Sequence, residues 1–372
     1  MKIKQIETIP IRIPLKTVYS GSNYSMSNRC TIITRVYTTD GIIGECYNGD
    51  EDDTLVTIKQ IVDNEIAPKL LGEDVFNTER CSDIAREATR NSLRDRKLAT
   101  QAQACVDSAI HDAVGKALRT PLFRMWGGHR SELPVTCVAG YHVKDQSAKS
   151  IGDEIEQLRA KGFAGCKFKV GRLTPEADIK RLEVVSMAAG SDFIITVDAN
   201  QNWSAREAVR FGLLAQKKNI NLFWFEEPCK WESDKSGMEL VRKATGIPVA
   251  AGQSEISAGG CRDLMMSQSI DYCNFDASWG GGPTEWKRVA GMARCFDVCM
   301  AHHEEAQISA HLLGSISHGS FVELFHPDRD PIFYCLFENH PQVENGKYRI
   351  PDGDGWGLSL DKAVIAKYRT DK

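Results

Sequence analysis

The 372-residue chain, with 42% hydrophobic and 26% charged residues, has the composition of a globular protein and is long enough for two domains. Its formal net charge of −4, without a basic run, argues against nucleic-acid binding, and no apolar run approaches the length of a membrane span. Its twelve cysteines lie mostly within apolar patterns without a C-x-x-C pair, and the N-terminus lacks a signal-peptide pattern, which together predict reduced thiols and a cytoplasmic location.

The first part of the chain predicts a small α+β domain. "MKIKQIETIPIRIPLK" alternates apolar and polar residues and is typical of an edge strand, and "CTIITRVYTTDGIIGECY" predicts a hairpin around "TDG". Apolar residues at helical spacing follow in residues 55–66 and in a small-residue stripe over 99–118, which indicates helices that pack closely. Pro121, Gly127 and Gly128 in "TPLFRMWGGH" then break the helical pattern, so we place the end of this domain at residue 128.

A regular alternation of strands and helices begins after that break. Eight short apolar strands, from "LPVTCVAGY" to "SFVELF", are mostly separated by helical segments, and this order predicts a parallel sheet. Their spacing of roughly 20 to 30 residues favours a closed barrel over an open doubly wound sheet. No G-x-G-x-x-G follows the first strand, and the glycine-rich "SWGGGPTEW" lacks the lysine of a P-loop, so neither nucleotide-binding motif is present.

Polar groups stand at the carboxyl end of every strand from the second to the eighth. One such group could be a helix cap, but seven in register, 20 to 31 residues apart, predict a site at the mouth of the barrel, where parallel strands open on one face. The residues at these strand ends are Lys167 and Lys169, Asp198 and Asn200, Glu226 and Glu227, Gln253 and Glu255, Asp276, His302 and His303, and Glu323.

The residue types at these strand ends suit proton abstraction beside a metal ion. Asp198 and Glu226, with an oxygen ligand from the next strand, form a hard site of the kind that binds Mg²⁺, and no Cys/His pattern for zinc occurs. Lys167 and Lys169 point to the same side of their strand, and beside a metal each should have a depressed pKa and be able to act as a base.

A second base and an acid complete the expected chemistry. His303, oriented by Asp276, is a candidate base opposite the lysines. A metal flanked by two bases is suited to removing the proton α to a carboxylate, because the metal takes up the charge of the resulting enediolate. Glu323, if protonated among other anions, would donate a hydrogen bond to that enediolate.

This set of motifs resembles the enolase superfamily, and within it the mandelate racemase subgroup, over nearly the whole chain. The resemblance implies a modified TIM barrel, (β/α)7β, over residues 129–325, and an α+β capping domain formed by residues 1–128 and a returning C-terminal segment, 326–372. It implies Mg²⁺ as cofactor.

The resemblance also assigns roles to individual residues. The "KFK" motif matches Lys169 as the base and Lys167 as its neighbour at the substrate carboxylate. His303 is preferred to His302 because of its distance to "ISAHLL". The remaining matches are the metal ligands Asp198 in "VDANQNW" and Glu226 in "EEP", the histidine's partner Asp276, and the electrophilic Glu323.

One position departs from the family pattern. The third metal ligand should be Glu or Asp after a glycine on the fifth strand, but "AAGQSE" has Gln253 in that position. An amide oxygen can bind a hard cation, although it removes one negative charge from the site. Glu255, two residues further, faces the same way if the strand continues, so both residues stay candidates and the register favours Gln253.

Several other residues are candidates for supporting or binding roles. Asn200 lies on the same side of the chain as Asp198 and should support the site, and Arg329 in "HPDRDP" would bind a second carboxylate or form a salt bridge to the cap. We expect Glu227 to face away from the metal and His302 to pack on the opposite side of its strand from His303, while Glu304 either touches substrate or lines a loop. The loops "YSGSNYSMSNR" and "CYNGDEDD" resemble the family's capping loops, which makes candidate substrate contacts of Tyr19, Tyr24 and Tyr47.

These expectations together predict an enzyme that acts on a small carboxylate, with neither a nucleic-acid nor a membrane partner. Dehydration of a sugar acid to a 2-keto-3-deoxy acid, a hydro-lyase reaction, is the first expectation, and racemisation or epimerisation of a hydroxy acid on the same site is the alternative. A non-catalytic binding protein is the third, if Gln253 marks the loss of the metal. Polar-poor helical faces favour a homo-oligomer.

Overall fold

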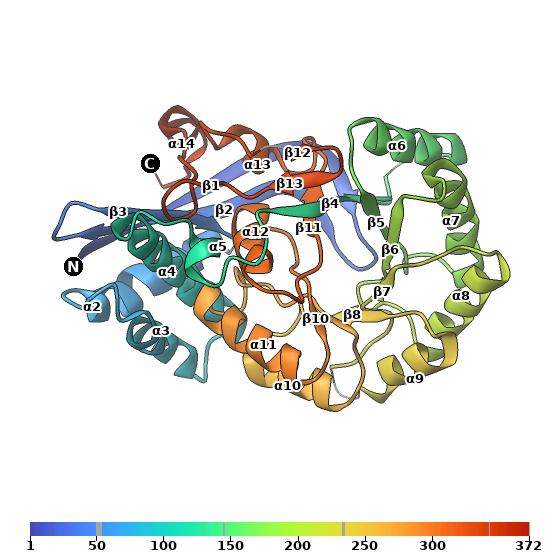
Figure 1. The fold of residues 1–372 in the computed structure, drawn as a ribbon, viewed down its shortest axis with the longest axis horizontal. Helices are drawn as coiled ribbons and strands as arrows, with labels where there is room; N and C mark the ends of the chain where they lie inside the picture. Colours follow the sequence, from blue (N-terminus) through green and yellow to red (C-terminus); the bar gives the residue numbers. More distant parts are fainter. Residues whose placement is uncertain (50–53, 144–145, 233–234, 342, 372) are drawn as a thin grey trace.

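An antiparallel sheet of three strands forms one side of the capping domain in the computed structural model, which describes residues 1–49, 54–143, 146–232, 235–341 and 343–371 (Figure 1). The predicted hairpin is confirmed, with its turn at Gly41 in a left-handed conformation (φ +85°). The strands, in the order β1-β2-β3, are β1 (Ile3–Ser20), β2 (Ser25–Thr38) and β3 (Ile43–Asn48).

Helix α4 (Arg96–Ala117) packs closely on this sheet, as its small-residue stripe predicts. A Cβ added at Gly44 of β3 would lie 2.0 Å from the carbonyl oxygen of Ala109, so glycine on one side and alanine on the other allow the two backbones to approach. The other helical segments of the cap are α1 (Leu55–Ile61), the π-helical Val62–Ile66, α2 (Ala67–Leu70), α3 (Thr78–Arg86), the 3-10 turn Glu87–Arg90 and α5 (Leu122–Met125).

The second domain is a barrel of parallel strands. In the part of the chain that the structure describes, the barrel strands are β4 (Glu132–Ala139), β5 (Gly165–Lys169), β6 (Ile194–Asp198), β7 (Trp224–Glu226), β8 (Val249–Ala251), β9 (Tyr272–Cys273), β10 (Cys299–Met300) and β11 (Val322–Phe325). Strand β11 pairs with β4, and the backbone N–H of Ser320 donates to the carbonyl oxygen of Met300 (2.8 Å), which joins the segment before β11 to β10.

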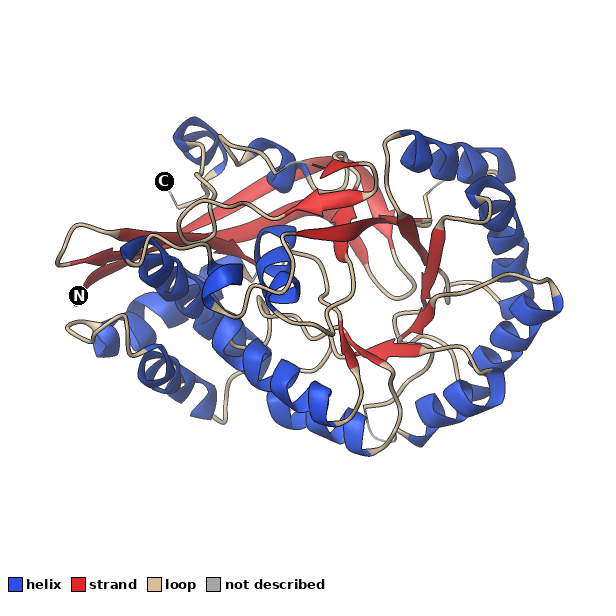
Figure 2. Cartoon of the chain, viewed as in Figure 1, coloured by secondary structure: helices blue, strands red, loops and turns tan. Residues whose placement is uncertain are grey.

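Helices follow the first seven barrel strands and form an outer arc around them (Figure 2). They are α6 (Ala148–Ala160), α7 (Pro175–Ala189), α8 (Ala205–Lys217), α9 (Ser236–Thr245), α10 (Ala258–Met266), α11 (Pro283–Cys295) and α12 (Ala306–Ser315). The expected (β/α)7β barrel with an α+β cap is therefore confirmed. Among the described residues no helix is both long and apolar enough to span a membrane.

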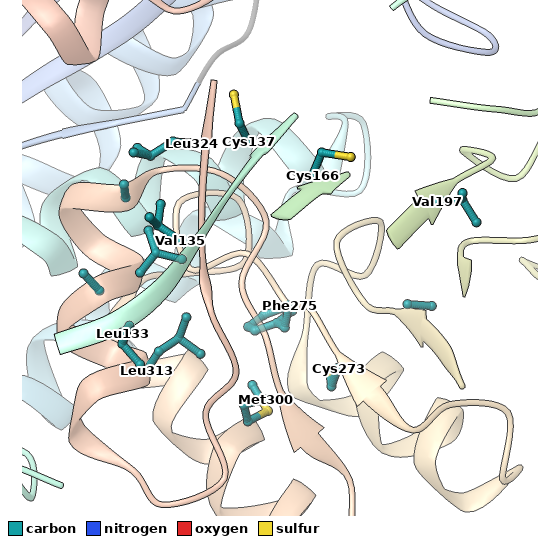
Figure 3. Packing of buried hydrophobic residues seen from close by; sticks show 14 of the residues in the cluster. Leu133, Val135, Cys137, Cys166, Val197, Cys273, Phe275, Met300, Leu313 and Leu324 are labelled. Atoms are coloured by element: carbon teal, nitrogen blue, oxygen red, sulfur yellow. The ribbon is translucent and has the colours of Figure 1, made fainter. Parts of the chain in front are cut away.

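Apolar packing below the mouth of the barrel supports the polar strand ends. Trp224, two residues before Glu226 on β7, stacks on Phe321 with ring centroids 4.6 Å apart. Cys166 and Val197, which alternate with the polar residues of β5 and β6, belong to the larger buried apolar cluster, part of which Figure 3 shows. The two-residue period of the strands thus separates apolar from polar side chains.

The C-terminal segment leaves the barrel and returns to the cap. After β11 it forms α13 (Pro331–Cys335), β12 (Val343–Glu344), β13 (Lys347–Arg349) and α14 (Lys362–Tyr368), and β13 pairs antiparallel with β4. Beyond α14, Arg369 forms a β-bridge with Ile11 of β1. The two chain termini accordingly lie on the same side of the molecule (Figure 1).

A buried ion cluster joins the cap to the barrel. The guanidinium of Arg29 on β2 donates to Glu305 Oε1 from Nη2 (2.8 Å) and to Asp330 Oδ1 from Nε (3.0 Å). All three side chains are at most 8% exposed, so each charge depends on its partners for the interactions that water would otherwise supply.

We predict that Arg29→Met lowers the free energy of unfolding by about 3 to 5 kcal/mol, because it leaves two carboxylates buried without their counter-charge. Denaturant unfolding followed by fluorescence measures this loss. The matched control is Arg80→Met, which removes an exposed pair with Glu73 and should change stability little. Equal losses in the two variants would contradict a structural role for the buried cluster.

Candidate active site

Strand register brings the predicted polar residues to one level of the barrel. Lys169 on β5 pairs with Asp198 on β6, and Asp198 pairs with Glu226 on β7. In a parallel sheet this register aligns the last residue of each strand, so that three ionisable side chains stand side by side at the mouth.

The two lysines form ion pairs with the carboxylates at this mouth. Lys169 Nζ lies 2.7 Å from Asp198 Oδ2. Lys167 Nζ, only 1% exposed, lies 2.9 Å from Glu226 Oε1 and 2.7 Å from Glu323 Oε1. Glu323 comes from β11 on the far side of β4, so Lys167 joins carboxylates from non-adjacent strands.

The chain's own charges set the pKa values of this cluster. Burial disfavours the ammonium form of Lys169, but the carboxylate of Asp198 together with Tyr24 and Tyr141 outweighs burial, so the pKa of Lys169 is raised well above its usual value. Burial raises the pKa of Glu226 to about 8, against the opposing effect of Lys167 and with added repulsion from Asp198. The lysine pKa values expected to be depressed are therefore raised by the protein's own groups, and a depression requires a further cation beside them.

Asn200 supports Asp198 as expected. Its backbone N–H donates to Asp198 Oδ1 (2.8 Å) and its side-chain amide donates to Asp198 Oδ2 (3.0 Å). The cap contacts the same turn, because Ser22 donates to the carbonyl oxygen of Ala199 (2.8 Å) and Asn23 donates to that of Asn200 (3.0 Å). The loop between β1 and β2 thus packs against the turn that follows Asp198.

His303 stands on another wall of the mouth with Asp276 behind it. His303 Nδ1 lies 3.0 Å from Asp276 Oδ2, and the other oxygen of Asp276 accepts from the backbone N–H of Ser278 (2.7 Å). Burial, together with the ammonium groups of Lys167 and Lys169, lowers the pKa of His303 well below its usual value, which favours the neutral ring.

His302 takes no part in this pair. Its Nε2 accepts from the backbone N–H of Ala277 (3.0 Å), its Nδ1 donates to the carbonyl oxygen of His303 (2.7 Å), and its ring lies near Trp286. Burial lowers its pKa to about 4. His302 thus packs in the interior as expected, although it lies beyond the end of β10 and its Nε2 is 3.8 Å from Asp276 Oδ1.

Two buried oxygen atoms near the carboxylates have no hydrogen-bond partner among the described residues: Glu226 Oε2 and Gln253 Oε1. Carboxylate and amide oxygens are the donors that Mg²⁺ and Ca²⁺ prefer, so these atoms fit a hard cation better than they fit an apolar core. No group of three or more His, Cys, Asp or Glu side chains suited to a metal occurs in the described ranges. A cation here would therefore bind a mixed set of two carboxylates and one amide.

Glu227 was expected to face away from the metal, and that expectation is wrong. Its carboxylate accepts from Gln253 Nε2 (2.9 Å) and from Ser254 Oγ (2.7 Å), and it lines the pocket. Strand β7 ends at Glu226, and Glu227 has a left-handed backbone (φ 39°), so the alternation of side chains along a strand no longer holds. This contact orients Gln253 with its amide nitrogen toward Glu227 and its oxygen free for a cation.

Glu255 lies away from the site. Strand β8 ends at Ala251, and the chain turns so that the backbone N–H of Glu255 donates to the carbonyl oxygen of Gly252 (3.0 Å). A Cβ added at Gly260 would lie 1.7 Å from Glu255 Oε2, so this carboxylate packs on the start of α10. The alternative in which Glu255 supplies the third ligand does not fit this structure.

A pocket of about 360 Å³ opens above these groups. Its lining includes Tyr24 and Arg329 from the expected set, and Trp279 as a wall residue. It also includes Lys97 of α4, which the sequence did not single out. Arg329 Nη2 lies 3.7 Å from Glu304 Oε1, and its guanidinium lies over the Phe325 ring.

Two of the three candidate tyrosines are placed elsewhere. Tyr19 packs edge-on against Tyr141 (5.4 Å between centroids), and Tyr47 is buried against Phe337 (5.5 Å). Neither belongs to the pocket lining. Of the second expected capping loop, residues 50–53 lie outside the described residues.

Family comparisons agree with this geometry. A model described as "Mandelate racemase / muconate lactonizing enzyme, N-terminal domain" matches residues 4–127, and one described as "Enolase C-terminal domain-like" matches residues 150–364. The chain belongs to the enolase superfamily, in its mandelate racemase subgroup. The resemblance inferred from the sequence motifs is thereby confirmed.

Relatives within the superfamily catalyse different reactions. The chain is 26% identical over 347 residues to arabinonate dehydratase of Saccharolobus solfataricus, covering 91% of this chain and 90% of that protein. It is 28% identical over 291 residues to N-succinyl-L-Arg/Lys racemase of Bacillus cereus, covering 76% and 74%. Some superfamily members related to this chain are therefore dehydratases, and others are racemases.

A solved structure shares both the fold and a substantial part of the sequence. It is a mandelate racemase/muconate lactonizing enzyme from a marine actinobacterium in complex with magnesium. The two chains are 45% identical, with a TM-score of 0.93 over 100% of this chain and 99% of the other.

Proposed function

We propose that this protein is a Mg²⁺-dependent enzyme that removes the proton α to a substrate carboxylate, and that it dehydrates a sugar acid to a 2-keto-3-deoxy acid. The observation that carries the proposal is the pairing of Lys169 with Asp198 on one wall and of His303 with Asp276 on another, around one pocket. Dehydratases of sugar acids among the relatives support the choice of reaction.

Asp198, Glu226 and Gln253 would hold the Mg²⁺. When bound, the ion would stabilise the negative charge that develops on the substrate carboxylate as the α proton leaves. The amide of Gln253 contributes no charge, so the site carries one negative charge fewer than a site with three carboxylates. We therefore expect a lower affinity for the ion than three carboxylates would give.

The chain's own side chains account for the proton transfers. Lys169, once its pKa falls beside the cation, accepts the α proton, or His303 accepts it from its own wall of the pocket. Asp276 holds the His303 ring in the tautomer with a proton on Nδ1. Lys167 would neutralise the substrate carboxylate, and His303 in its protonated form would help the β-hydroxide to depart.

The contacts of Glu323 suit a supporting role. Glu323 forms an ion pair with Lys167 and accepts a hydrogen bond from the backbone N–H of Glu304 (3.2 Å). Held in this way, it is placed to donate a hydrogen bond to the enediolate when protonated. Tyr24 and Arg329, on the pocket wall, would contact the rest of the acid.

Racemisation or epimerisation of a hydroxy acid is the second candidate. The presence of bases on two walls favours it, because one base can remove the proton and the other can return it to the opposite face. The N-succinyl-L-Arg/Lys racemase among the relatives supports this candidate. A homo-oligomeric state and a cytoplasmic location stay predictions.

We predict that Mg²⁺ raises the thermal midpoint of the wild-type protein, and that the rise grows with the logarithm of the Mg²⁺ concentration. At one hundred times Kd, the free energy of unfolding should be about 2.7 kcal/mol higher than without the ion. Gln253→Leu should remove most of this shift, whereas Gln253→Glu should move it to lower Mg²⁺ concentrations. Differential scanning fluorimetry, in buffer from which divalent cations have been removed, measures the Mg²⁺ response of both variants and of wild type.

Gln157→Leu is the matched control, because Gln157 is exposed on α6 and should leave the Mg²⁺ response unchanged. A wild-type midpoint that does not respond to Mg²⁺ would contradict metal binding and would favour a non-catalytic binding protein.

We further predict that a library of acid sugars, incubated with enzyme and Mg²⁺ in D₂O, contains a compound that yields keto acid. Lys169→Ala and His303→Asn should each reduce turnover by about 10² to 10⁴-fold, because each removes a proton-transfer group. Lys149→Ala, at an exposed ion pair on α6, is the control that should keep full activity.

Deuterium at the α carbon without keto acid would assign racemisation or epimerisation instead. If no acid in the library gives keto acid or α-deuterium, and both variants equal wild type, the proposed function is contradicted.

A further inference from the structure

The ring of His303 lies between two carboxylates. Asp276 Oδ2 is 3.0 Å from Nδ1, and Glu304 Oε1 is 3.3 Å from Nε2. His303 and Glu304 both line the pocket, so Nε2 is the ring nitrogen on the pocket side, and a substrate in the pocket would meet the Glu304 carboxylate as well as the ring.

Glu304 is held in place by an unusual backbone. Glu304 and Glu305 both have left-handed conformations (φ 51° and 46°), which are unfavourable for residues with side chains and persist only where surrounding contacts enforce them. The Glu304 N–H donates to Glu323 Oε2 (3.2 Å), and the next residue, Glu305, is fixed by Arg29 across the cap–barrel joint. The turn therefore aims the Glu304 carboxylate, only 5% exposed, at the ring of His303.

We propose that Glu304 is a further catalytic acid, which shares one proton with His303 and delivers it to the departing β-hydroxide. This inference rests on the proposed dehydration. It assigns to Glu304 the final transfer of the proton that the pair holds between Nε2 and Oε1.

The proton transfers balance. Lys169 takes the α proton, and the C–H electron pair moves into the enediolate. As the β C–O bond breaks with its electron pair on oxygen, that oxygen takes the proton from Glu304 and leaves as water. Glu304 and His303 together then hold one proton fewer and Lys169 one more, and exchange with solvent restores both when the product leaves.

The charges around the pair disfavour a positively charged ring. The groups around His303 are Asp276, His302, Lys97, Lys167 and Lys169, and Arg329 Nη2 lies 3.7 Å from Glu304 Oε1. Burial and the ammonium groups lower the pKa of the ring, so the neutral ring can accept at Nε2 a hydrogen bond from a protonated Glu304, whose Oε1 lies 3.3 Å away. A ring that only donated to Glu304 would need to stay positively charged.

The first test needs no substrate. The ring nitrogen shifts of His303 are followed by NMR from pH 5 to 9 in the Mg²⁺-loaded protein, with His303→Asn to assign the signal. The ring should report one ionisation of the pair in wild type, and Glu304→Gln should abolish it or move it by about 1 unit or more. Glu156→Gln, at an exposed position of α6, should leave it in place.

An unchanged titration in Glu304→Gln, or none in wild type, would overturn the shared proton. This result does not depend on the reaction that the enzyme catalyses.

The second test uses the acid sugar found in the D₂O screen. Glu304→Gln should keep α-deuterium exchange within about tenfold of wild type but lower keto-acid formation by about 100-fold or more, because proton abstraction does not need the acid. Glu304→Asp should restore part of the keto-acid rate. Equal losses of exchange and product, or no loss of either, would overturn the role.

A failure of the proposed function would give different results from a failure of the Glu304 proposal. A wild type that neither exchanges nor dehydrates any acid would overturn α-proton abstraction, and the NMR result would still decide whether the pair shares a proton. Exchange without keto acid in wild type would leave α-proton abstraction standing and would overturn both the dehydration and the acid role of Glu304.

Discussion

The mouth of the barrel depends on two buried lysines that compensate carboxylates from three strands. Lys167 and Lys169 are surrounded by Asp198, Glu226 and Glu323, so three anions face two cations at almost complete burial. Buried charges are tolerated only when paired, and the remaining negative charge leaves the cluster suited to a cation. Burial, with added repulsion from Asp198 and Glu323, raises the pKa of Glu226.

Strained turns after the strand ends complete the placement of the site's side chains, which the strand register starts. Asn200, Glu227 and Glu304 follow three different strands, and all three have left-handed backbones. Each turn redirects a polar side chain: Asn200 onto Asp198, Glu227 onto Gln253, and Glu304 onto His303. The cap contacts two of these turns, through Ser22 and Asn23 at the first and Arg29 beside the last, so the contacts that join cap and barrel also hold the site.

The sequence predicts this barrel well where side chains follow strand periodicity. Spacing along eight strands placed Lys167, Lys169, Asp198, Glu226 and His303 at one mouth, because the carboxyl ends of parallel strands must share an edge. That reasoning fails beyond the last residue of a strand: Glu227, directly after β7, turns into the pocket, and Glu255, four residues after the end of β8, turns out of it. The pocket roles of Lys97 and Trp279 depend on how distant segments meet, which local patterns do not encode.

The most direct test of this account is a crystal structure of the protein grown with Mg²⁺. The account predicts one ion bound by oxygen atoms of Asp198, Glu226 and Gln253, with the Gln253 amide nitrogen still donating to Glu227 and with Lys169 and His303 on different sides of the ion. An ion bound elsewhere, or a Gln253 side chain turned away from it, would contradict the account.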